Sequence, residues 1–377
     1  MKPRLEIADI LREYGEGFIT QKQPVCYHRK VLHAISICRT VALGGQVERC
    51  TDCGHERIAY NSCRNRHCPK CQSTNRERWI MGRREDLLDC KYFHVVFTLP
   101  EELNGFCMHY PEQMYELLFH SAKETLFAFG KDEKHLGARM GAIAVLHTWG
   151  QTLQLHPHIH MIVPAGGIDK IGNWENTKRE GQYLFPVKAM SKVYQGKFME
   201  YFRGLMKESG MEIPKDLREH LYKKDWVVYA KRPFGGVNQV IEYLGRYTHK
   251  IAISNHRLRS MTDGRVTFTY KDYRDGSSTK LMSLGANEFL RRFCLHILPK
   301  GFRKIRHYGI LSSRNKPVLR EQQKKMNCEP ENEREKDYQS ISKERLGFDV
   351  TVCPCCKKGK METVFSFKPH APPVIKK

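Results

Sequence analysis

Residues 155 to 163 of this 377-residue chain read Leu-His-Pro-His-Ile-His-Met-Ile-Val, an alternation that fits one extended strand. Successive side chains of a strand point to opposite faces, so His158 and His160 share one face while Ile159 and Met161 take the other. Two imidazoles side by side on a half-apolar strand form part of a divalent-metal site. Taken alone, such a pair more often represents half-buried histidines satisfied by hydrogen bonds.

A second segment, residues 237–247, has the periodicity of a helix. At 100° per residue its apolar face is formed by Val237, Val240, Ile241 and Leu244. A separate face carries Gln239, Tyr243, Arg246 and Tyr247. Tyr243 and Tyr247 are four residues apart and therefore lie one above the other. By itself this tyrosine pair indicates little more than the rim of an amphipathic helix.

The histidine strand is preceded by the pattern of a partner strand. Residues 141–149 and 158–163 are joined by a short polar loop, which predicts an antiparallel hairpin. His147 and His158 would then lie near one another across the hairpin. We therefore expect His147 to be the third metal ligand, with Gln239 and His156 as the alternatives.

Paired cysteines indicate structural zinc. Cys50 and Cys53 form one Cys-x-x-Cys pair, and fourteen residues separate it from a second pair, Cys68 and Cys71. This spacing is close to that of ribbon or treble-clef sites, in which four thiolates leave zinc no open position. Because no export signal accompanies the 14 cysteines, disulfides are not expected.

Further cysteines and histidines leave the number of zinc ions open. Cys63 and His67 are four residues apart, which on a helical turn would direct both at a second ion, completed by Cys38 or another histidine. Buried cysteines and a solvent-facing histidine explain the same residues. Near the C-terminus, Cys353 and Cys356 form a knuckle that needs two more ligands, and a tail without metal is the alternative. The candidate partners are His370, Cys328, Cys294 and His296.

The net charge of +23 and a pI near 9.5 predict a polyanionic partner, and nucleic acid is the obvious one. No run approaches the roughly eighteen apolar residues of a membrane span, and residues 1–6 lack the apolar core of a signal peptide. We therefore expect a soluble, cytoplasmic protein, associated with the nucleoid of a bacterium and not with a membrane. Neither the monomer nor the dimer is favoured by these features.

Four regions are predicted along the chain. Residues 1–25 carry one helix, and residues 26–90 form a zinc-binding unit that contacts DNA. Residues 91–300 form the catalytic domain, and residues 301–377 a basic C-terminal region with a charged linker at 329–344. Cations at Arg64, Arg66 and Lys70 make the zinc unit a DNA clamp. The basic-aromatic run 301–309 is suited to phosphate contact and base stacking.

Strand and helix patterns in the catalytic region predict an α+β fold. Strands are expected at 91–100, 141–149, 158–163, 183–186, 226–230, 249–258 and 266–270, with a hairpin turn at Asp263-Gly264. Helices are expected at 5–14, 111–130 and 192–209. Together they predict an antiparallel sheet of four or five strands with helices on one side.

Several ordered motifs give the chain a family resemblance. They are residues 62–71, Ser-Cys-Arg-Asn-Arg-His-Cys-Pro-Lys-Cys; 96–100, Val-Phe-Thr-Leu-Pro; 147–151, His-Thr-Trp-Gly-Gln; the His-Pro-His-Ile-His run; and 243–257. With these motifs the chain resembles the HUH endonucleases, and among them the two-tyrosine transposases of the insertion-sequence 91 family. The resemblance implies an RNA-recognition-like HUH core, an N-terminal zinc-binding domain and rolling-circle-like transposition through single-stranded, hairpin-containing DNA ends.

The chemistry expected of such a site is strand cleavage by tyrosine. Mg²⁺ or Mn²⁺ held by the histidines would polarise the scissile phosphate and align it with a tyrosine oxygen. Arg246 and Lys250, the other expected DNA contacts, would favour the phenolate. Attack would leave a 5′-phosphotyrosine and a free 3′-hydroxyl. We expect Tyr243 to attack first and Tyr247 second, although one tyrosine acting while the other packs is the alternative.

Other classes of protein share part of this pattern. A plasmid relaxase or replication initiator would use the same metal and tyrosines, but the cysteine-rich unit and the lack of helicase motifs favour a transposase. A non-catalytic zinc DNA-binding protein would have no use for the histidines and tyrosines. A zinc hydrolase is disfavoured because no His-Glu-x-x-His motif and no carboxylate beside the histidine strand are present.

Overall fold

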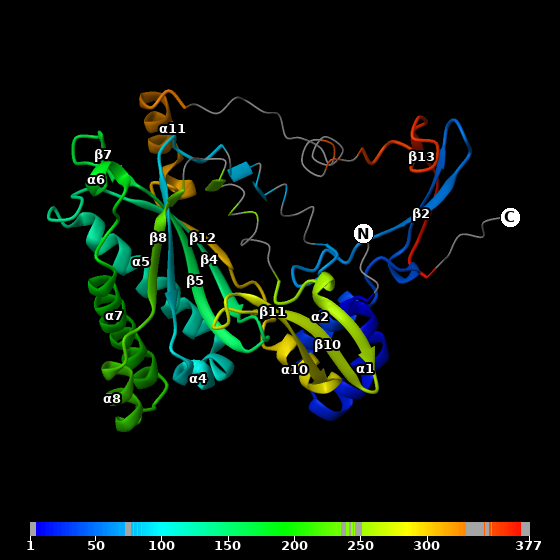
Figure 1. Ribbon diagram of the computed structural model, residues 1–377, viewed down its shortest axis with the longest axis horizontal. Helices are drawn as coiled ribbons and strands as arrows, with labels where there is room; N and C mark the ends of the chain where they lie inside the picture. Colours follow the sequence, from blue (N-terminus) through cyan, green and yellow to red (C-terminus); the bar gives the residue numbers. More distant parts are fainter. Residues whose placement is uncertain are drawn as a thin grey trace. The chain divides into compact units, whose positions relative to one another are not determined.

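The computed structural model divides the chain into two compact units (Figure 1). It describes residues 5–71, 77, 79–80, 82–83, 85–234, 239–240, 243, 245, 251–328, 343, 347 and 349–370. Unit 1 comprises Met1–Trp79, His249–Ile297 and Asn332–Lys377, and unit 2 comprises Ile80–Thr248 and Leu298–Glu331. The predicted domains were consecutive stretches of the chain, whereas each unit combines separate segments. Residues 249–297, which were predicted to be part of the catalytic domain, belong to unit 1 together with the N-terminal segment.

Unit 2 is built on a five-stranded antiparallel sheet with the order β12-β4-β5-β3-β8. Its strands are Tyr92–Thr98 (β3), Gly141–Trp149 (β4), Leu155–Pro164 (β5), Val228–Phe234 (β8) and Ile305–Gly309 (β12). The predicted hairpin is confirmed, since β4 and β5 pair with His147 opposite His158. The predicted α+β fold with an antiparallel sheet is also confirmed.

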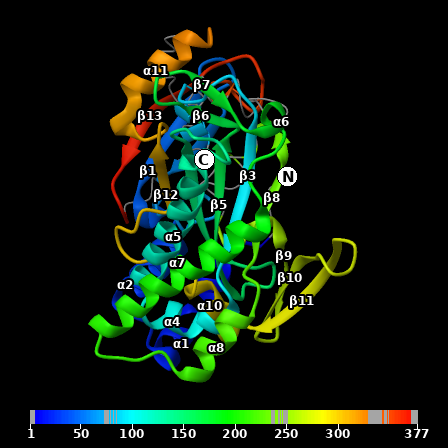
Figure 2. The ribbon, with the colours of Figure 1, turned by 90° about the vertical axis from the view of Figure 1, so that its left-hand side faces the viewer.

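Two long helices, Pro111–Lys131 (α5) and Val187–Glu208 (α7), cover one face of this sheet (Figures 1 and 2). Pro111 is at the first helical position, where no N–H is needed. Every fourth residue along each helix is buried and apolar, as in Met114, Leu118, Ala122 and Leu126, and in Tyr194, Phe198, Phe202 and Met206. They share one core with the inward-facing residues Phe93, Val95, Phe97, Ala142, Ala144, Leu146, Ile159, Met161 and Val163. Because strand side chains alternate, the histidines of β4 and β5 face away from the helices.

The remaining elements of unit 2 are short. They are Asn104–His109 (α4), Gly166–Ile168 (β6), Trp174–Asn176 (β7), Lys178–Gly181 (α6), Lys215–Lys223 (α8) and Lys316–Lys325 (α11). Residues 239, 240, 243 and 245, within the predicted tyrosine helix, are helical. No helix in the described parts of either unit has the length and apolar character needed to cross a bilayer.

Unit 1 contains two three-stranded sheets. One has the order β13-β1-β2, from Met361–Phe367 (β13), Gly45–Cys50 (β1) and Glu56–Tyr60 (β2). The other has the order β11-β10-β9, from Leu258–Thr262 (β9), Arg265–Asp272 (β10) and Ser278–Gly285 (β11). Its helices are Ile7–Lys22 (α1), Cys26–Ser36 (α2) and Ala286–Cys294 (α10). The β1–β13 pair is antiparallel, with Cys50 opposite Met361, and joins residues 45–50 to residues 361–367.

Three predicted elements were wrong. The first helix does not end at residue 14 but continues to Lys22, because Phe18 extends its buried face. Residues 183–186 form no strand. The segment 249–258 is not a strand where it is described, since residues 255–257 form a 3-10 turn and β9 begins at Leu258. The side chain of Asn255 is used elsewhere, because its Oδ1 accepts a hydrogen bond of 3.1 Å from the backbone N–H of Ile7 at the start of α1.

Candidate functional site

Three histidines lie together on the sheet face opposite the helices. His147 comes from β4, and His158 and His160 come from β5. Their ligand nitrogens all lie within 4.8 Å of one another, and the ring centroids of His147 and His160 are 4.6 Å apart. The arrangement follows from the register, which places His147 directly opposite His158. The structure therefore brings together the three side chains predicted as metal ligands, and this group is called the histidine triad below.

Hydrogen bonds orient the triad. His158 Nδ1 lies 2.7 Å from the backbone carbonyl of His156, which can only accept, so the proton is on Nδ1 and the lone pair on Nε2. Such a bond on the far ring nitrogen is typical of metal-binding histidines. His156 thus contributes its carbonyl, while its own side chain is exposed and does not join the triad. Gln239, the other alternative ligand, is exposed on its helix.

Stacking holds the ring of His147 in place. Trp149, two residues after His147, stacks on it with ring centroids 4.7 Å apart and an interplanar angle of 22°. Lys304 Nζ lies 5.1 Å from the centroid of the Trp149 ring, within the range of a cation–π contact. The positive charge of Lys304 is thereby held against the ring that stacks on His147.

A fourth histidine, His94 on β3, was missed by the sequence analysis. Its Nε2 lies 2.8 Å from His160 Nδ1, and the two rings stack with centroids 5.0 Å apart. Burial, reinforced by the charge of Lys231, lowers the pKa of His94 to about 4, so the ring is neutral near pH 7. The signal was present, since His94 is the one imidazole in the otherwise apolar and aromatic run Tyr-Phe-His-Val-Val-Phe.

Tyr243 approaches the same group of imidazoles. Its hydroxyl lies 2.6 Å from Nε2 and 3.0 Å from Nδ1 of His94. Its ring also packs against Phe234 of β8, with centroids 4.9 Å apart. The first of the two predicted nucleophiles is therefore beside the triad. Tyr247, Arg246 and Lys250 lie outside the described residues.

The cysteines form two clusters of four, and the predicted grouping of Cys50 and Cys53 with Cys68 and Cys71 was wrong. The proximal thiolate cluster consists of Cys38, Cys63, Cys68 and Cys71. The bridging thiolate cluster consists of Cys50, Cys53, Cys353 and Cys356. The physical reason is the β1–β13 pairing, which carries the C-terminal knuckle to the end of β1. None of the four residues proposed as partners for Cys353 and Cys356 is used.

Sulfur separations in both clusters fit a bound metal better than disulfides. Cys38 Sγ and Cys63 Sγ lie 3.4 and 3.6 Å from Cys71 Sγ. In the bridging cluster the Cys50–Cys356 and Cys53–Cys353 separations are both 3.7 Å. A tetrahedron with zinc–sulfur bonds of about 2.3 Å has edges of about 3.8 Å, whereas a disulfide bond is only about 2.05 Å long.

Backbone N–H groups support the thiolates of the bridging cluster. Asp52 N–H and Cys355 N–H each donate to the first sulfur of their knuckle, over 3.4 Å. The backbone N–H groups of Gly359 and Lys358 lower the pKa of Cys356 to about 6. A Cβ added at Gly359 would lie 2.5 Å from Cys50 Sγ, so only glycine lets the chain pass this close to the cluster.

His67 does not join the proximal cluster, contrary to the prediction of a site with Cys63. Its Nε2 accepts a 3.4 Å hydrogen bond from Arg66 Nε. The predicted DNA contacts of this unit are also unequal. Arg64 is exposed, whereas Arg66 is half-buried and Lys70 forms an ion pair with Glu6.

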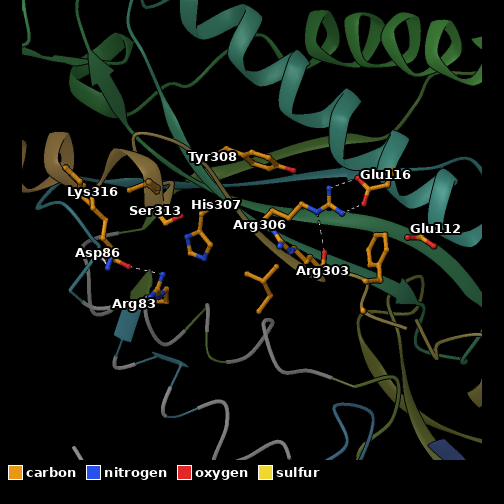
Figure 3. A pocket seen from close by; sticks show the side chains of 15 residues that line it. Arg83, Asp86, Glu112, Glu116, Arg303, Arg306, His307, Tyr308, Ser313 and Lys316 are labelled. Carbon is orange, nitrogen blue, oxygen red and sulfur yellow. Dashed lines mark hydrogen bonds and ion pairs between the residues drawn. The ribbon is translucent and has the colours of Figure 1, made fainter. Parts of the chain in front are cut away.

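Much of the basic run at 301–309 makes contacts within unit 2. Its second half forms β12, where Arg306 pairs with Glu116 of α5 and lies 4.1 Å from the Phe119 ring centroid. A cavity of about 720 Å³ lies beside this strand (Figure 3). Within it several basic groups face acids, since Arg83 lies 2.8 Å from Asp86 and Arg306 pairs with Glu116. This matching of charges makes the cavity a weak candidate for phosphate binding.

Two family models match this chain, one over residues 10–99 and one over residues 141–317. A family model described as "Putative transposase" matches residues 141–317, which include the histidine triad. A model described as "Transposase zinc-binding domain" matches residues 10–99, which include the proximal thiolate cluster and Cys50 and Cys53. No solved structure matches the chain.

Two relatives extend this match over most of the chain. "Putative transposase y4qJ" of Sinorhizobium fredii (strain NBRC 101917 / NGR234) is 43% identical over 385 residues, covering 96% of this chain and 95% of the relative. "Transposase for insertion sequence element IS801" of Pseudomonas savastanoi pv. phaseolicola is 32% identical, covering 74% and 68%. The fold and its two kinds of candidate metal site are thus those of a transposase with a zinc-binding domain. The chain belongs to the insertion-sequence 91 family, as its motifs predicted.

Proposed function

We propose that this transposase cuts single-stranded DNA at the ends of its element and becomes covalently attached to it through Tyr243. The observation that carries the proposal is the 2.6 Å contact of the Tyr243 hydroxyl with His94, which in turn contacts His160 of the triad. A nucleophile and a set of metal-ligand side chains are thereby held in one place. The matches to transposases supply the DNA substrate, and the net charge of +23 favours its binding.

The triad fits a divalent ion by its chemistry. Three imidazoles with nitrogens within 4.8 Å of one another suit a first-row divalent ion such as Mn²⁺. Mg²⁺ prefers oxygen ligands and would depend more on phosphate and water. Such an ion, when bound, would polarise the scissile phosphate and neutralise the charge that develops on it.

The chain's own residues would carry out an exchange of phosphate esters. The Tyr243 oxygen forms a bond to phosphorus while the bond from phosphorus to the 3′-oxygen breaks. The phenolic proton leaves, and the departing 3′-oxygen gains a proton to become a hydroxyl. The 5′-phosphotyrosine conserves the energy of the broken ester, so a later strand transfer needs no ATP. Tyr247 would attack a second strand in the same way.

Incubation of the full-length protein with labelled single-stranded DNA carrying an element end tests this proposal. We expect Mn²⁺ or Mg²⁺ to produce a protein–DNA adduct that survives denaturing electrophoresis and is absent with EDTA. His160→Ala should reduce adduct formation by about a hundredfold or more, because one of three metal ligands is lost. His109→Ala is the matched control, since it removes an exposed imidazole on α4 that is not part of the triad.

One result would contradict covalent cleavage. DNA binding by the wild type without any adduct, on several end sequences and with both metals, would leave only a non-covalent DNA-binding role for this site.

We also propose that each thiolate cluster holds one structural zinc ion. The match to a zinc-binding domain supports zinc in this unit, and the sulfur separations of 3.4–3.7 Å support two tetrahedral sites. Four thiolates leave no coordination position for substrate, so these ions would stabilise the DNA-contacting unit and take no part in catalysis.

A further inference from the structure

His94 lies between the metal-ligand side of the site and the nucleophile. No other described imidazole of the sheet has contacts to both a triad member and the Tyr243 hydroxyl. It is 7% exposed and is part of β3, which pairs with the central strand β5. Its ring therefore has little room to rotate. The register places it opposite Ile162 of β5, which is two residues beyond His160 and points to the same face of the sheet.

We propose that His94 is a positioning residue that couples His160 to Tyr243. It would hold the ring of His160 with Nε2 turned toward the metal, and it would hold the Tyr243 oxygen beside the triad. This inference rests on the proposed function, because it assumes that the triad binds a metal and that Tyr243 is the nucleophile.

Assigning a donor and an acceptor to each hydrogen bond determines which nitrogen of His94 carries the proton. When His160 uses the Nε2 lone pair for a metal, its proton must be on Nδ1, and Nδ1–H donates to His94 Nε2 over 2.8 Å. His94 then carries its own proton on Nδ1, which lies 3.0 Å from the Tyr243 oxygen. The neutral phenol can donate to Nε2 over 2.6 Å, sharing that lone pair with His160, but once the phenolic proton has left only the Nδ1–H can donate to the oxygen. A phenolate is an acceptor only, so this N–H is suited to hold the attacking form of Tyr243.

The described strand neighbours of His94 are a cation and two apolar side chains. The residue opposite it on β8 is Lys231, a cation that disfavours a charged ring. Its neighbours along β3 are Phe93 and Val95, which face the helices and form no hydrogen bond through their side chains. A purely structural role at this position would be filled more simply by an apolar residue such as the nearby Val96.

Two amide substitutions separate the contacts of His94. His94→Gln places an amide near the position of Nε2 and can still contact His160. His94→Asn places it near Nδ1 and is too short to reach His160. Both are polar and smaller than or similar to histidine, and thermal unfolding establishes that each variant folds. His307→Asn is the control, because His307 is a partly buried histidine on β12 of the same sheet without contact to the triad.

The first readout is the affinity of the zinc-loaded, full-length protein for Mn²⁺ in the absence of DNA, from electron paramagnetic resonance of the free ion. We expect His94→Asn to weaken Mn²⁺ binding about 10- to 100-fold, as for other residues that orient metal ligands, and His94→Gln to stay within about threefold of the wild type. The second readout is the rate of adduct formation at saturating Mn²⁺, which reports the contact to Tyr243. There we expect His94→Gln to be slower than the wild type by about tenfold or more.

The outcomes distinguish this inference from the proposed function. Mn²⁺ affinities and adduct rates of both variants equal to those of the wild type would overturn the role of His94 while leaving DNA cleavage intact. Equal losses of Mn²⁺ affinity in both variants would also overturn it, because they would indicate a general packing defect. A wild type that binds Mn²⁺ but forms no adduct would refute the proposed cleavage, and the affinity difference between the variants would still decide whether His94 orients His160.

Discussion

Replacing Tyr243 by phenylalanine is expected to abolish covalent attachment to DNA while leaving the binding of Mn²⁺ and DNA nearly unchanged. The substitution removes only the hydroxyl that lies 2.6 Å from His94 and leaves the ring packed against Phe234. Because that oxygen is the proposed nucleophile, we expect a loss of at least about a thousandfold in the rate of adduct formation, or about 4 kcal/mol in the barrier. Denaturing electrophoresis under single-turnover conditions measures the loss.

Tyr229→Phe is the matched control for this experiment. Tyr229 is on β8, opposite Val96, and is therefore on the same sheet face as His94, but it is 53% exposed. Its substitution should leave the rate within about twofold, because the described site makes no use of it. If Tyr243→Phe formed the adduct at the wild-type rate and Tyr247→Phe did not, the two tyrosines would have the reverse of the proposed roles.

Cys353→Ser is expected to release one of two zinc ions and to destabilise unit 1. The serine hydroxyl is a poor substitute for the thiolate that lies 3.7 Å from Cys53 Sγ, and the three remaining sulfurs cannot complete a tetrahedral site. Metal loss is among the most destabilising single changes, and we expect a loss of about 3 kcal/mol or more in the free energy of unfolding. Zinc per chain from elemental mass spectrometry and denaturant unfolding measure the two effects.

The chain provides its own control at Cys355. This cysteine lies in the same knuckle but is exposed and outside the cluster, and only its backbone N–H contacts Cys353 Sγ. Cys355→Ser should therefore keep both zinc ions. Two zinc ions in Cys353→Ser, or equal zinc loss in both variants, would contradict the proposed ligand set.

The histidine triad could be predicted from sequence because it depends on local rules. Alternation along a strand fixed His158 and His160 on one face, and a short hairpin loop fixed His147 beside them. The grouping of the cysteines could not be predicted in this way. Each Cys-x-x-Cys knuckle is recognisable from its spacing, but all knuckles are alike, and their pairing depends on which strands meet. The β1–β13 pair joins segments about 300 residues apart, which no local pattern reveals.

His94 was missed for a related reason. A single histidine in a buried strand has many uses, and its contacts to His160 and Tyr243 depend on the register of β3 against β5 and on the packing of a remote helix. The predicted strand at 249–258 failed because alternation alone does not distinguish a strand from a turn whose polar residue, Asn255, bonds to α1.

The bridging thiolate cluster also sets an order of events during synthesis. Cys53 and Cys353 are 300 residues apart in the chain, and at about 5–20 residues per second a ribosome needs about 15–60 s to travel between them. During that interval the first knuckle has emerged with only half of its ligands, whereas the proximal cluster, complete at Cys71, has all of its own. A prematurely terminated chain would therefore possess one closed zinc site and one open one. The finished bridging site thus marks a chain translated through to its C-terminal knuckle.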